Sequence, residues 1–201
     1  MALPTLRDPR LHIAAVIITI HVLGQVALGF RVSITQILVA IGTCAIIEVS
    51  WTLHRTGKLV WPASALLTGS SVGLIFRVVG TDHGDWWSTQ GWYWYLLVAG
   101  GSLLTKYIIR YRGAHLFNPS NLGLVVAFLL LGSSRVEPLD FWWAPLDRWM
   151  IAAYIVLLVG GFAITARLKL LGMAVGFWAI LTSGVGVLAA SGHYITARWS
   201  F

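Results

Sequence analysis

The sequence predicts an all-α, polytopic integral membrane protein that forms a single transmembrane domain over residues 1–201. Hydrophobic residues make up 58% of the chain and charged residues only 10%, whereas soluble domains carry about 45–50% and about 25%. The mean hydropathy is +0.80. About seven separate stretches approach the length of a membrane-crossing helix, and we expect some of them to be broken or to cross only halfway.

This composition excludes several functional classes. Intrinsic disorder requires low hydrophobicity. Cys44 is the only cysteine, so no internal disulfide can form, and the histidines lack metal-ligand spacing, so we expect no metal site. The net charge is +7, but the 14 Lys and Arg residues are scattered between apolar runs. Because nucleic-acid binding requires basic residues clustered on one face, we expect no nucleic-acid partner.

The predicted spans follow one another with short connections. They are residues 11–30, 34–53, 60–79, 92–109, 119–131, 149–168 and 170–190. The first is too long to be a cleavable signal peptide, and Arg31 and the second span follow it at once. The fourth begins in a cluster of Trp and Tyr, which favour the headgroup layer. The sixth follows a second aromatic cluster, and the seventh is apolar throughout.

The third and fifth segments are the candidates for broken or half-crossing helices. The third carries Pro62, the run Thr68-Gly69-Ser70-Ser71 and Arg77, and the fifth is short and opens with Asn118-Pro119-Ser120-Asn121. Irregular backbone at membrane depth is tolerated only where protein or a polar cavity covers it, and in transporters it often marks a binding site. The alternative is that both are ordinary helices with a proline in the first turn.

Basic residues at the ends of the segments predict the orientation. With the N-terminus in the cytoplasm, nine lie on the cytoplasmic side and five on the other side, as the positive-inside rule favours. The nine are Arg7, Arg10, Arg55, Lys58, Lys106, Arg110, Arg112, Arg167 and Lys169. The five are Arg31, Arg77, Arg135, Arg148 and Arg198.

Two ionisable side chains lie deep within predicted spans, Glu48 in the second and His21 in the first. An intramembrane carboxyl suggests a proton or cation site or a partner for a cofactor. Equally, Glu48 could be a protonated or hydrogen-bonded carboxyl that pairs with Lys106 or caps a helix. His21 has no second histidine at its depth to complete a haem site, so we expect it to hydrogen-bond to a neighbouring helix.

The stretch from Lys106 to Gly123 suggests an anion site. Asn118 is suited to the N-cap of a helix with Pro119 at its first position. The free N–H groups and the dipole at such an end attract anions, and Lys106, Arg110, Arg112 and His115 precede it. A phosphate or carboxylate of a cofactor or lipid would fit there; the alternative is simple capping with basic side chains that reach lipid phosphates. The small residues from Thr68 to Gly73 suit close helix packing, or contact with a planar ring.

Three stretches carry a resemblance to a known family: residues 6–12 (LRDPRLH), 61–69 (WPASALLTG) and 113–123 (GAHLFNPSNLG). They resemble the flavin-carrying membrane subunit shared by the sodium-translocating NADH:quinone reductase (its B subunit) and the Rnf electron-transport complex (its D subunit). The likeness is greatest to the shorter members labelled enediyne-biosynthesis proteins. It implies about ten helices in two related repeats, broken helices near mid-bilayer, flavin, electron transfer toward quinone or another carrier, and the bacterial inner membrane.

The chain departs from this family at two points. Respiratory members attach FMN through a threonine in a Ser-Gly-Ala-Thr motif, and that tetrapeptide is absent here, so we do not expect covalent FMN. Seven spans are also fewer than ten, which leaves open that the protein continues past Phe201.

We therefore expect a membrane-embedded subunit of an electron-transfer complex, with the bilayer and other membrane subunits as partners; whether it is itself an enzyme stays open. Its cofactor would be non-covalent flavin (FMN or riboflavin) or quinone. The candidate cofactor-binding residues are Thr68, Gly69, Ser70, Arg110, Arg112, His115, Phe117, Asn118, Ser120 and Asn121. One alternative is a cofactor-free accessory subunit of a larger photosynthetic or respiratory complex. A second is a small-solute transporter or channel.

Overall fold

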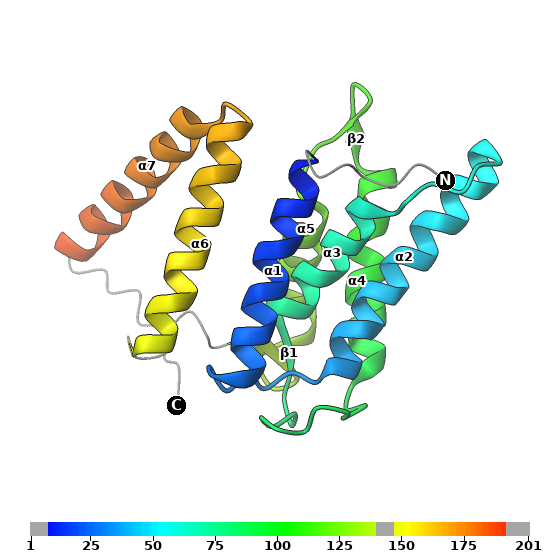
Figure 1. Ribbon diagram of the computed structural model, residues 1–201, viewed down its shortest axis with the longest axis horizontal. Helices are drawn as coiled ribbons and strands as arrows, with labels where there is room; N and C mark the ends of the chain where they lie inside the picture. Colours follow the sequence, from blue (N-terminus) through cyan, green and yellow to red (C-terminus); the bar gives the residue numbers. More distant parts are fainter. Residues whose placement is uncertain (1–7, 140–146, 192–201) are drawn as a thin grey trace. The chain divides into compact units, whose positions relative to one another are not determined.

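The computed structural model describes residues 8–139 and 147–191 (Figure 1). The described residues form seven α-helices and four short strands, and the predicted all-α class is confirmed. The elements are α1 (Pro9–Val26), α2 (Ile34–Thr56), α3 (Ala63–Ile75), β1 (Phe76–Val78), α4 (Trp92–Ile108), β2 (Arg110–Tyr111), β3 (Ala114–His115), α5 (Pro119–Leu131), β4 (Val136–Pro138), α6 (Arg148–Arg167) and α7 (Leu171–Ala190).

The chain separates into two compact units, Met1–Leu157 and Leu158–Phe201. The first contains α1 to α5, all four strands and the beginning of α6. The second contains the rest of α6 and α7, joined by a tight turn in which Lys169 has the left-handed φ of 59°. None of the described side chains of α7 is buried, so this helix presents apolar residues all round.

Within the described part of the chain, four helices are long and apolar enough to cross a membrane: α1, α2, α6 and α7. The apolar helices α3 and α5 have 13 residues each, and α4 has 17. The predicted count of seven spans is therefore not confirmed. The apolar helices are compatible with a membrane protein, because about 20 apolar residues are needed for a complete helical crossing.

The third predicted segment is broken, as expected, and the break lies at Phe76. After α3 the chain becomes extended, and β1 pairs antiparallel with β4, with Arg77 opposite Glu137. The two side chains form an ion pair, in which Arg77 is almost fully buried. The strand pairing gives the backbone groups after α3 hydrogen-bond partners that the helix no longer supplies. The chain after the break is therefore regular, hydrogen-bonded structure rather than the frayed end of a helix.

Helix α3 lies at the centre of the first unit, in contact with α1, α2, α4 and α5. Gly69 permits this packing, since an added Cβ would lie 2.6 Å from the carbonyl oxygen of Ala40 on α2. Where α3 ends, the Tyr95 hydroxyl donates a hydrogen bond of 2.9 Å to the carbonyl of Phe76. The ring of Tyr95 also packs edge-on against Phe76, with centroids 5.1 Å apart. The residue at which the break begins is thus fixed by a buried neighbour.

Candidate ligand-binding cavity

A cavity of about 410 Å³ lies where the N-terminal parts of α1, α3 and α5 meet. Its polar lining residues are Arg10 from α1, Ser64, Thr68 and Ser71 from α3, and His115, Asn118 and Ser120 at the start of α5. Leu67, Leu116 and Phe117 add apolar surface. The structure thus brings the two proline-containing motifs of the third and fifth segments to one cavity, although they lie about 50 positions apart in the sequence.

The α5 side of the cavity is built by capping. Asn118 is the N-cap, as predicted, and its Oδ1 accepts hydrogen bonds from the N–H and the hydroxyl of Ser120, at 3.2 and 2.9 Å. Pro119 occupies the first helical position, where its missing N–H costs nothing. This arrangement holds Asn118 and Ser120 rigidly at the cavity wall.

The α3 side is organised differently. Pro62 is the N-cap residue and supplies no side-chain cap. The N–H of Ala63 donates to the carbonyl of Trp61 at 2.9 Å, and the first turn of α3 has no side-chain acceptor such as a Ser or Asn N-cap would give. The Thr68 hydroxyl donates to the carbonyl of Ser64 at 3.0 Å. Two helix N-termini, each carrying partial positive charge, therefore border a cavity that also contains Arg10 and His115. None of the described residues that line it is acidic, so the cavity suits an anionic group.

The other predicted site residues lie elsewhere. Gly69 packs against the backbone of α2, and Asn121 is absent from the cavity lining. The carbonyl of Ser70 lies 3.3 Å from Nε2 of His21 on α1. Because a carbonyl can only accept, Nε2 carries the proton. His21 therefore bonds to a neighbouring helix, as expected from the sequence.

Arg110 and Arg112 belong to the β2–β3 hairpin, and neither lines the cavity. The Arg110 guanidinium donates to the carbonyl of Gly113, and that of Arg112 lies 5.2 Å from the Tyr111 ring centroid. Both side chains are exposed. The two arginines were predicted at the anionic end of the site because they precede α5 in the sequence. Arg10 and Ser64 line the cavity but were not predicted, because no local pattern shows which helix ends will meet.

A second polar cluster abuts the cavity through Ser64. Lys106 donates to both carboxylate oxygens of Glu48, at 3.0 Å each, and to the Ser64 hydroxyl at 3.1 Å. The Tyr107 hydroxyl donates to Glu48 at 2.8 Å, and its ring stacks on Trp51. Of the interpretations left open for Glu48, the structure shows the pair with Lys106. Helices α2, α3 and α4 are thereby joined by charge-assisted hydrogen bonds.

Among residues 8–139 and 147–191, no three His, Cys, Asp or Glu side chains are grouped as metal ligands. No family model, curated protein or solved structure matches this chain. The cavity and the polar groups around it are therefore the features from which a function can be inferred.

Proposed function

We propose that this protein is a subunit of a membrane electron-transfer complex and binds a non-covalent, phosphate-bearing flavin in the cavity between α1, α3 and α5. The observation that carries the proposal is that Thr68 and Ser71 meet His115, Asn118 and Ser120 around one cationic cavity. Of these residues, Thr68, His115, Asn118 and Ser120 come from two of the three stretches that carry the resemblance to flavin-carrying subunits. A volume of about 410 Å³ also falls within the range of small-molecule sites, roughly 300–1,000 Å³.

The lining residues match the parts of FMN. Arg10, His115 and the N-termini of α3 and α5 would hold the phosphate. Phe117 offers an aromatic face to the ring system, and the hydroxyls of Ser64 and Ser71 offer hydrogen bonds. Flavin supplies one- and two-electron transfer when it is bound. Quinone has carbonyl oxygens that can accept a hydrogen bond but no anionic group to pair with the charge of Arg10, so the charge of the cavity favours FMN.

We further propose that the chain crosses the bilayer seven times with its N-terminus in the cytoplasm. Helix α3 rises about 20 Å over its 13 residues, and the three residues of β1 add about 10 Å. Their sum approaches the hydrocarbon thickness of about 30 Å. Pairing of β1 with β4 supports such a crossing, since unpaired backbone is not tolerated in lipid. The excess of basic residues at one set of span ends supports the orientation.

The test measures FMN and riboflavin binding to the purified protein by quenching of flavin fluorescence. Replacing Arg10 by Gln should weaken FMN binding about tenfold, the effect of one charge-assisted hydrogen bond, and leave riboflavin binding unchanged. Phe117→Leu should weaken both ligands. Arg31→Gln, the same substitution near the other end of α1, is the control and should change neither. A folded protein that binds neither flavin would refute the proposal.

A small-solute transporter is the second candidate, because the helix of the third segment stops at Ile75 and the chain continues as β1, and broken helices often mark the binding site of a transporter. Uptake of a solute into proteoliposomes that depends on Glu48 would favour it. A colourless protein without uptake, found only in stoichiometric complex with other subunits, would instead favour an accessory role.

A further inference from the structure

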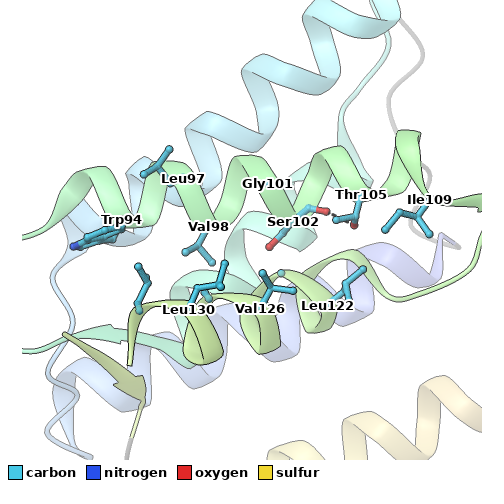
Figure 2. Close-up of a pocket in the computed structure, with 13 residues that line it drawn as sticks. Trp94, Leu97, Val98, Gly101, Ser102, Thr105, Ile109, Leu122, Val126 and Leu130 are labelled. Carbon is cyan, nitrogen blue, oxygen red and sulfur yellow. Dashed lines mark hydrogen bonds between the residues drawn. The ribbon is translucent and has the colours of Figure 1, made fainter. Parts of the chain in front are cut away.

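A second concave surface runs along α4 and α5, away from the cavity. It is a groove of about 390 Å³, and Figure 2 shows its walls: Trp94, Leu97 and Val98 come from α4 and Ile109 is its C-cap, and Leu122, Val126 and Leu130 come from α5. Its floor is the closest approach of the two helices, where an added Cβ on Gly123 would lie 1.8 Å from Ser102 Oγ.

The surface of the groove is apolar almost throughout. Ser102 is fully buried, and the Thr105 hydroxyl donates to the carbonyl of Ser102 at 2.7 Å. Leu97 and Leu130 are exposed. From Trp94 to Ile109 the groove follows α4 for about 22 Å, whereas one leaflet contributes about 15 Å of hydrocarbon. The groove can therefore take the full depth of an acyl chain.

One end of the groove carries positive charge. Ile109 lines that end, and the next residues form the β2–β3 hairpin with Arg110 and Arg112. Figure 1 shows this hairpin projecting beyond the end of α4. Both arginines are exposed. Basic side chains next to a membrane attract anionic headgroups. The groove is therefore apolar along its length, and two exposed cationic residues follow it in the chain directly after Ile109.

We propose that this groove and hairpin bind an anionic phospholipid, with one acyl chain between α4 and α5 and the phosphate headgroup on Arg110 and Arg112. This assigns a role to the two arginines that lie outside the cavity, and it does not depend on flavin binding. A transmembrane helix is about 10–12 Å wide, too wide to enter a groove of about 390 Å³, whereas a hydrocarbon chain fits.

The experiment adds phosphatidylglycerol or phosphatidylcholine to the delipidated full-length protein in detergent and counts bound lipids by native mass spectrometry. The wild-type protein should bind phosphatidylglycerol about tenfold more tightly than phosphatidylcholine. The double substitution Arg110→Gln and Arg112→Gln should remove this preference and leave phosphatidylcholine binding unchanged. Arg55→Gln with Lys58→Gln removes two exposed cations at the end of α2 and should keep the preference.

Gly101→Leu tests the groove itself. An added Cβ on Gly101 has no neighbour within 4 Å, so the leucine can extend from α4 into the groove, and it should weaken the binding of both lipids about tenfold. Gly42, on α2, has equally free space, and Gly42→Leu should bind lipid as the wild type does. Val126→Trp blocks the groove from α5 and replaces Gly101→Leu if that variant does not fold. Equal binding of the two lipids by the wild-type protein, or normal binding by both blocked variants, would overturn the proposal.

Discussion

Replacing Lys106 by Met should lower the free energy of unfolding by about 3 kcal/mol. The substitution keeps the length of the aliphatic side chain and removes the ammonium that neutralises Glu48. The carboxylate keeps the hydrogen bond from Tyr107 but no longer has an opposite charge. Glu48 and Lys106 side chains are only 17% and 21% exposed, so water compensates little of the loss. The measurement is reversible unfolding in mixed micelles, followed by circular dichroism.

Two further variants separate the loss of charge neutralisation in Lys106→Met from any loss of side-chain packing. The double variant Glu48→Gln with Lys106→Met has no unpaired charge and should recover most of the lost stability, because removing a whole ion pair costs far less than removing one partner. Lys58→Met removes an exposed cation just beyond α2 and should change stability by less than about 0.5 kcal/mol. If Lys106→Met is no more harmful than Lys58→Met, the pair contributes nothing to the fold.

The helix boundaries show which parts of this fold local sequence can predict. Helix α5 begins at Pro119 and ends at Leu131, as predicted, because Asn118-Pro119 is a strong start signal and Gly132 ends it with a φ of 74°. The position of the break after α3 was not predictable. Phe76 to Val79 is as apolar as the helix before it, and its extended form depends on pairing with residues 136–138, about 60 positions away.

Among the polar groups, too, some partners can be predicted from the sequence and others depend on contacts between distant parts of the chain. An intramembrane acid needs a partner on physical grounds, so Lys106 was a reasonable candidate for Glu48. The contributions of Tyr107 and Ser64 depend on the rotation of α3 and α4 about their axes, which weak amphipathicity leaves undetermined. Gln36 is a further example: it is fully buried and bonds to Thr81 and to the carbonyl of Gln90, partners in a loop whose path the sequence does not reveal.

Alanine substitutions at Gly69, Gly73 and Gly42 should have graded effects on stability, because all three glycines lie in α2 or α3 but differ in the space around them. At Gly69 an added Cβ would lie 2.6 Å from both the Ala40 carbonyl oxygen and the Ile41 Cα. These are backbone atoms that can move only if the helices separate. We therefore expect Gly69→Ala to cost about 3 kcal/mol.

Alanine substitutions at Gly73 and Gly42 are the comparisons for the loss of stability expected from Gly69→Ala. At Gly73 the nearest atom would be the Ile37 Cα at 3.3 Å, so a shift of a few tenths of an ångström accommodates the methyl group. The strain that Gly73→Ala introduces should nearly cancel the stability gained from the higher helix propensity of alanine, so the free energy of unfolding should change little. At Gly42 there is no neighbour within 4 Å, and alanine should stabilise the protein by about 0.5–1 kcal/mol.

Unfolding in mixed micelles tests the close approach of α2 and α3. We expect Gly42→Ala to be the most stable of the three variants, Gly73→Ala to be intermediate and Gly69→Ala to be the least stable. Equal stability of the three variants would mean that these helices do not pack through Gly69. The cavity would then lose its support, because Ser64, Thr68 and Ser71 are carried by the helix that this glycine holds against α2.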